Sequence, residues 1–174
     1  MSSEEPICSL LSGGDRRSIG RTEEVIALIR QKPKKIVDLL ECLWNPDHCI
    51  SMRAADATEK ISREQAALLQ PYKAALLGLL AEATQQELRW HLALIVPRLH
   101  LTCSECQRAA GLLQTYLEDR SSIVKTFALQ GLSDLIQQDA SLQPMVLDLL
   151  RSAARTGTPA MRARSRILLK QQER

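Results

Sequence analysis

Four short stretches of similar sequence recur from residue 50 onward, and each opens a segment with a helical pattern of apolar residues. They are Ile50-Ser-Met-Arg53, Leu88-Arg-Trp-His91, Val124-Lys-Thr-Phe127 and Met161-Arg-Ala-Arg164, and successive stretches begin 38, 36 and 37 residues apart. A regular spacing of this length is typical of chains built from repeated helix pairs, each of which packs only on its neighbours. The repeat therefore predicts an architecture, whereas the sequence contains no comparable motif that predicts an activity.

The residues that follow each stretch test this repeat. Counting from the first residue of a stretch, the positions 4, 8 and 11 further on share one helical face. They are mainly apolar and become more polar in the last segment: Ala54, Thr58 and Ile61; Leu92, Val96 and Leu99; Ala128, Leu132 and Leu135; Ser165, Leu169 and Gln172. We expect this face to point into the core and to be weakest in the last pair.

Composition favours helices throughout the 174 residues. Hydrophobic residues make up 45% of the chain but aromatic residues only 3%, which suits a core of Leu, Ala, Ile and Val packed helix on helix. The sequence contains no run of alternating β-branched residues of the kind that predicts a strand. The expected fold is all-α: a right-handed superhelix, or solenoid, of about four helix pairs that forms one domain over residues 22–174. A flexible lead and loop over residues 1–21 would precede it.

Capping and proline signals place the expected helices. In chain order they are a cap at Thr22, capping-box pairs Thr84–Glu87 and Thr102–Glu105, a kink or an early helix end at Pro97, a cap at Asp119 or Ser121, and the Thr158-Pro159 helix start. They predict a helix over about 22–31, and they place the last pair at about 142–154 and 159–172. In each pair we call the first helix A and the second helix B.

One position after the start of three of the four stretches stands a cation: Arg89, Lys125 and Arg162. Asp119 precedes one stretch by five residues, and Asn45 another. Over residues 34–172 this pattern resembles the HEAT repeat, in which an acidic or amide side chain in the turn and a cation at the start of helix B form a ladder between repeats. The resemblance implies that B helices line a concave surface. It also implies an incomplete ladder here, because the cation recurs more often than the acid.

The chain is more closely similar to a group of uncharacterised bacterial HEAT-like proteins. The stretches that carry this resemblance are residues 13–21, 52–61 and 87–93, which read GGDRRSIGR, MRAADATEKI and ELRWHLA. The resemblance implies a bacterial cytoplasmic protein, and it supplies no activity.

Charge is distributed unevenly. The net charge is +3, yet residues 151–174 contain seven lysines and arginines against one glutamate. Such an asymmetry indicates either a surface for nucleic acid or an acidic partner, or a solvated end of a solenoid.

Residues of the B helices are the candidates for binding a partner. They are Arg53, Asp56, Arg89, Trp90, His91, Lys125, Arg162 and Arg166. The alternatives are structural: a ladder for the cations, a solvated pair for Asp56 and Lys60, and packing between repeats for Trp90. His91 lies one turn after Glu87 and is within reach of it. A second candidate is an anion-binding loop over Ser12–Arg21, with Arg16, Arg17 and Arg21; the alternative is a loop that caps the first helices.

The most favoured function is a non-catalytic scaffold that presents its B helices to a protein partner. The alternative is a solenoid that binds nucleic acid, with the HEAT-like alkylpurine DNA glycosylases as its enzymatic variant. That class uses Trp, Arg and Asp side chains, for which Trp90, Arg89 and Asp56 are the matching residue types here. No catalytic motif supports an enzyme, and we expect no metal and no cofactor.

Five cysteines, an odd number in a chain of this size, predict reduced thiols. The pair Cys103–Cys106 is a lone CxxC without the further ligands that zinc requires. The start of the chain has no secretory pattern and no apolar run is long enough to span a bilayer. We therefore expect no membrane partner and a cytoplasmic location.

Overall fold

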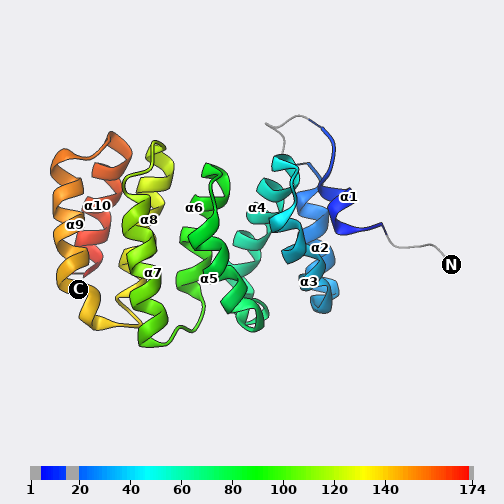
Figure 1. The fold of residues 1–174 in the computed structure, drawn as a ribbon, viewed down its shortest axis with the longest axis horizontal. Coiled ribbons are helices and arrows are strands. Elements are labelled where there is room, and N and C mark those ends of the chain that lie inside the picture. The colour runs from blue at the N-terminus through cyan, green and yellow to red at the C-terminus, as the bar shows by residue number, and fades with distance from the viewer. Residues whose placement is uncertain (1–4, 15–19, 173–174) are drawn as a thin grey trace. The chain divides into compact units, whose positions relative to one another are not determined.

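The computed structural model describes residues 5–14 and 20–172, and in them the fold is all-α, as the sequence predicts. The chain divides into two compact units, Met1–Pro71 and Tyr72–Arg174. Figure 1 labels the helices and colours them from blue at the N-terminal end to red at the C-terminal end. The prediction of a single domain over residues 22–174 stays a prediction.

Unit 1 is built around one long helix. Its elements are α1 (Ile7–Leu11), α2 (Thr22–Gln31), the 3₁₀ turn η1 (Pro33–Lys35), α3 (Ile36–Glu41), η2 (Cys42–Trp44), α4 (His48–Gln65) and η3 (Ala66–Leu68), with η4 (Gln70–Tyr72) at its boundary. The helices α1, α2 and α3 all pack against α4. The first B helix, α4, is one continuous helix of 18 residues.

Unit 2 contains three helix pairs. They are α5 (Lys73–Glu82) with α6 (Gln86–Ile95) and η5 (Val96–Arg98), α7 (Cys103–Tyr116) with α8 (Ser122–Leu135), and η6 (Ala140–Leu142) and α9 (Gln143–Thr156) with α10 (Pro159–Gln172). Each B helix packs against the next: α6 against α8, and α8 against α10. In Figure 1 the pairs α7/α8 and α9/α10 stand side by side within this unit.

The predicted inward face of the B helices is buried. In α8 the four positions Val124, Ala128, Leu132 and Leu135 have no exposed surface. In α10 only Ser165 of the corresponding four is completely buried, and Leu169 is half-buried. The repeat therefore locates the core correctly, including its weakening in the last pair.

Several predicted helix ends are confirmed. Thr102 and Glu105 form a capping box at the start of α7, the Ser121 hydroxyl caps α8, and the Thr158 hydroxyl accepts from the amide of Met161 at the start of α10. The helix also stops at Ile95, before Pro97, and tightens into η5.

Two predicted caps are wrong. Gln85 occupies the cap position of α6, so Glu87 stands too early in the helix to complete a box with Thr84. Thr22 is a buried first residue of α2 rather than its cap, which is Arg21.

The N-terminal lead is not simply a flexible segment in its described part. Residues 7–11 form α1, whose Ile7, Leu10 and Leu11 are buried against unit 1. This apolar spacing of three and four residues places the three side chains on one helical face.

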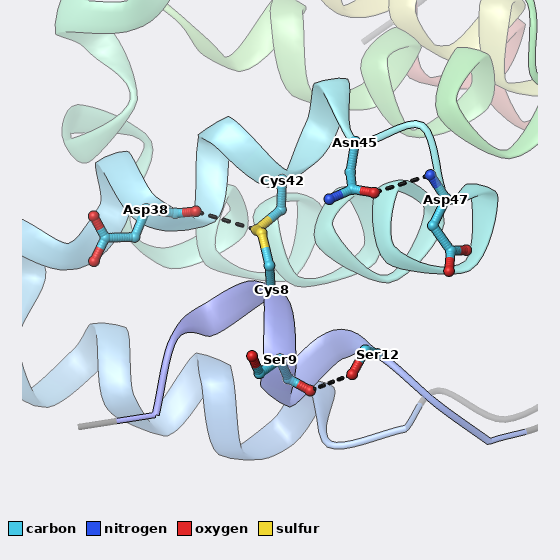
Figure 2. Close-up of a disulfide and its surroundings, with 7 residues drawn as sticks. All are labelled: Cys8, Ser9, Ser12, Asp38, Cys42, Asn45 and Asp47. Atoms are coloured by element: carbon cyan, nitrogen blue, oxygen red, sulfur yellow. Dashed lines mark hydrogen bonds between the residues drawn. A yellow bond between two sulfur atoms is a disulfide. The ribbon is translucent and has the colours of Figure 1, made fainter. Parts of the chain in front are cut away.

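The prediction of five reduced cysteines is wrong for two of them. Cys8 of α1 and Cys42 of η2 form a disulfide, with Cα atoms 5.9 Å apart (Figure 2). The packing of α1 against α3 brings together two cysteines that are 34 residues apart in the sequence, a proximity that counting cysteines does not reveal. Cys49, Cys103 and Cys106 are free thiols.

Candidate interaction surface

Arg53 is buried inside unit 1, with 1% of its surface exposed. Its Nη1 donates hydrogen bonds to the carbonyl oxygens of Leu11, at 2.8 Å, and Gly13, at 2.5 Å. Gly20 has a φ of +57°, and a Cβ at that residue would lie 3.1 Å from Arg53 Cζ. A side chain larger than glycine would therefore crowd the guanidinium. Arg53 fastens the N-terminal loop and is excluded from the surface proposed to contact a partner.

Asp56 and Lys60 form the ion pair that their spacing predicts. Asp56 Oδ2 lies 3.1 Å from Lys60 Nζ, and Lys60 also reaches Glu23 of α2, at 2.8 Å. The hydrogen bond to Glu23, followed by that to Asp56, raises the pKa of Lys60. Asp56 and Lys60 both belong to α4, and the contact of Lys60 with Glu23 is the one that joins α4 to α2. Both side chains are half-buried, so the pair is structural but less exposed than the solvated pair given as the alternative.

Only one arginine of the proposed anion loop lies in the described residues. Arg21 pairs with Glu5 and Glu24, both at 2.9 Å, and these partners raise its pKa. Two carboxylates already neutralise this guanidinium, so Arg21 is not set up to hold an external anion. Arg16 and Arg17 lie outside the described residues.

The recurring cations Arg89, Lys125 and Arg162 all lie in unit 2, and the first of them pairs with a carboxylate. Arg89 Nη1 lies 2.5 Å from Asp119 Oδ2 in the turn of the next helix pair, and Arg89 Nε donates to the carbonyl oxygen of Ala83 at 2.7 Å. Burial raises the pKa of Asp119, but the hydrogen bonds from the Ser121 amide and Arg89 outweigh it and leave the pKa below its ordinary value. Arg89 also lies over the ring of Tyr116, with Cζ 5.1 Å from the centroid.

The other two recurring cations, Lys125 and Arg162, are less firmly paired than Arg89. The charge of Lys125 acts on Asp119 and lowers its pKa further, while Arg162 Nη1 donates to the carbonyl oxygen of Gly157 at 3.3 Å. Both residues are half-buried. Thr156, the last residue of α9, occupies the position five residues before its stretch that Asp119 occupies before the preceding one, so Lys125 meets no carboxylate there.

A row of aromatic side chains joins α6 to α8. The rings of Trp90 and Phe127 stack, with centroids 5.2 Å apart and planes inclined by 26°. His91 stacks on Trp90 and is itself buried, with 2% exposed. Its Nδ1 lies 2.6 Å from the backbone carbonyl oxygen of Glu87, so the expected contact with Glu87 involves its backbone. His91 is therefore part of the interior, whereas Trp90 and Phe127 are half-buried and reach the surface.

Polar side chains continue this row from α8 to α10. Arg164 Nη1 donates to Gln130 Oε1 at 3.2 Å, and Gln130 Nε2 donates to Asp134 Oδ1 at 2.8 Å. Burial raises the pKa of Asp134, partly offset by Gln130 and by the charges of Arg98 and Arg164. We call Trp90, Phe127, Gln130, Asp134 and Arg164 the aromatic–polar surface. Four of these five were not among the predicted site residues, although Phe127 and Arg164 end two of the repeated stretches.

The remaining residues singled out in the sequence, Arg166 and the CxxC pair Cys103–Cys106, differ in how exposed they are. Arg166 of α10 is exposed, and Cys103 is exposed at the first position of α7. Cys106, one turn further, is buried, and burial raises the pKa of its thiol. A raised pKa disfavours the nucleophilic thiolate form.

In the part of the chain that the structure describes, no three His, Cys, Asp or Glu side chains come together as a potential metal site. Over the same residues, no helix is both long and apolar enough to cross a bilayer. Comparisons of the chain with protein-family models, with curated proteins and with solved structures gave no match.

Proposed function

We propose that this protein is a non-catalytic scaffold built as a HEAT-like solenoid, and that it presents its B helices to a protein partner. The observation that carries the proposal is the pairing of Arg89 with Asp119. A phosphate-binding groove needs a continuous stripe of uncompensated cations. Here the first of the three recurring cations, Arg89, is neutralised by Asp119, and the charge of Lys125 also acts on that carboxylate.

Two further features support the solenoid part of the proposal. The B helices α6, α8 and α10 pack in sequence order, and the Arg89–Asp119 contact joins successive pairs as a HEAT ladder would. A stack of this kind holds a row of side chains at fixed spacing, which suits recognition of an extended or helical partner.

The aromatic–polar surface is the proposed contact region. Trp90 and Phe127 offer rigid apolar area, and aromatic residues are enriched among the side chains that dominate binding energy. Gln130, Asp134 and Arg164 are joined by hydrogen bonds and keep donor and acceptor groups near the surface beside the rings. Such a mixture of an apolar centre with polar neighbours is characteristic of protein interfaces.

We propose the cytoplasm as the location, from the resemblance to bacterial HEAT-like proteins. The Cys8–Cys42 disulfide does not support this location, because a reducing compartment would hold the two cysteines as thiols. Cys42 Sγ lies 3.2 Å from the carbonyl oxygen of Asp38, so a reduced Cys42 has an acceptor in place (Figure 2).

The alternative function, nucleic-acid binding with a glycosylase variant, is tested by a salt titration. Binding of labelled single- and double-stranded DNA is measured for the wild type and for an Arg89→Ala/Lys125→Ala variant whose fold is checked by circular dichroism. We expect no micromolar binding that depends on these two cations. Micromolar binding that weakens steeply with salt and is lost in the variant would overturn the scaffold proposal in favour of a nucleic-acid groove.

A further inference from the structure

A hollow on the last helix pair lies outside the aromatic–polar surface. Its volume is roughly 540 Å³, and it is lined by Asp148, Arg151, Ala154 and Arg155 of α9 and by Leu169 of α10. Leu169 occupies the position in its segment that Val96 and Leu132 occupy in theirs. Those two are completely buried, and the helix pair that follows packs against the elements that carry them, α8 against η5 and α10 against α8. Leu169, by contrast, is half-buried and lines the hollow.

Two arginines and one aspartate line this hollow, and the helices that form it carry further cations. Residues 149–172 contain six lysines and arginines and no aspartate or glutamate. Arg151 and Arg155 line the hollow, while Arg162 and Arg166 share a helical face with Leu169, at spacings of seven and three residues. Asp148 pairs with Arg151 at 3.2 Å, both largely exposed. Among the described residues no carboxylate forms an ion pair with Arg155 or Arg166.

We propose that this hollow binds an acidic amphipathic segment of a partner protein. An aliphatic side chain of the segment enters between Ala154 and Leu169, and its carboxylates pair with Arg151 and Arg155, whose forked guanidinium groups suit carboxylates. The biological role of this hollow rests on the proposed scaffold function, but the hollow itself does not involve the aromatic–polar surface.

The chemistry of the hollow favours a polypeptide over a nucleic acid. A phosphodiester backbone would neutralise the arginines but would bring no aliphatic group to cover Leu169. An amphipathic helix supplies both, since side chains three and four residues apart place carboxylates beside an apolar side chain.

Fluorescence anisotropy with short labelled peptides tests the proposal. One peptide alternates glutamate-rich turns with leucine, a second carries serine in place of each leucine, and a short DNA duplex serves as a polyanion. We expect the Glu–Leu peptide to bind about tenfold more tightly than the Glu–Ser peptide, a difference of about 1.4 kcal/mol. An Arg151→Glu/Arg155→Glu variant should lose about tenfold or more of this affinity, and Leu169→Ser should remove the preference for leucine.

The control is Lys34→Glu/Arg108→Glu, which reverses two exposed cations elsewhere and leaves affinity for the Glu–Leu peptide nearly unchanged. Equal binding of the Glu–Ser peptide and of DNA would overturn the proposal in favour of general attraction to polyanions. Binding that is absent, or that does not differ between the wild type and the Arg151→Glu/Arg155→Glu variant, would also overturn it. A Trp90→Ala/Phe127→Ala variant should keep its affinity, so failure at this hollow is distinguishable from failure of the scaffold proposal.

Discussion

Loss of the Cys8–Cys42 disulfide should destabilise unit 1 by an amount set by the loop that it closes. The two cysteines are 34 residues apart. The chain-entropy relation gives about 4 kcal/mol for a loop of this length, and measured losses for native disulfides run from about 2 to 5 kcal/mol. Cys8→Ser is the suitable change because Cys8 is half-buried, while the buried Cys42 keeps the Asp38 carbonyl oxygen as an acceptor for its thiol. We therefore expect a loss near the entropic value.

Urea unfolding followed by tryptophan fluorescence measures this loss. Trp44 lies in unit 1, two residues after Cys42, so a Trp90→Phe background makes the signal report on this unit. With a slope of about 2 kcal/mol per molar urea, the midpoint should fall by roughly 2 M. Wild type in reducing agent should behave like Cys8→Ser, and Cys49→Ser, which removes a free thiol of the same unit, should change little. A loss below about 1 kcal/mol would refute the assignment of this cross-link as the fastening of α1.

Three further predictions concern packing, the buried arginine and pH. Gly131→Ala would bring a Cβ into the carbonyl oxygen of Ala93 on α6, so thermal unfolding should show a loss of about 1–3 kcal/mol; Gly111→Ala, with nothing within 4 Å, should instead gain up to about 1 kcal/mol. Arg53→Met removes the donor to Leu11 and Gly13, so we expect a loss of about 2–3 kcal/mol and faster hydrogen exchange after residue 11; unchanged exchange would count against its fastening role. Burial raises the pKa of Asp134, so the folded state keeps this proton to higher pH than the unfolded chain, and stability falls as pH rises through that interval. Asp134→Asn should therefore melt higher than wild type at neutral pH, and the two melting curves should converge below about pH 4; a lower melting temperature at neutral pH would contradict this account.

Features that follow from helical periodicity were predictable from the sequence. Val124, Ala128, Leu132 and Leu135 are buried because residues on one helical face meet the same surroundings. The capping box at Thr102 was also predictable, because it depends on residues three apart. The Thr84 box failed because α6 begins at Gln86, which the pattern alone does not fix.

Features that depend on how one helix meets another were not predictable. The Cys8–Cys42 disulfide requires α1 to form and to pack, and nothing in the glycine-rich segment after it indicates that Arg53 is its anchor. The stacking of Trp90 on Phe127 likewise depends on the register between α6 and α8. Sequence reasoning therefore found the repeated cations and missed most of the surface beside them.

Photo-crosslinking from the aromatic–polar surface tests the scaffold proposal most directly. Benzoylphenylalanine at position 127 keeps the phenyl ring of Phe127 and extends it by a benzoyl group, so the fold of this variant is checked first by circular dichroism. The same group at the exposed Trp44 of unit 1 serves as the control. After irradiation in cells of the source organism, we expect discrete protein adducts at position 127 that are absent at position 44 and diminish when Trp90→Ala is added. Adducts to RNA or DNA, or a pattern at position 127 that matches the one at position 44, would contradict the proposal that this surface binds a protein.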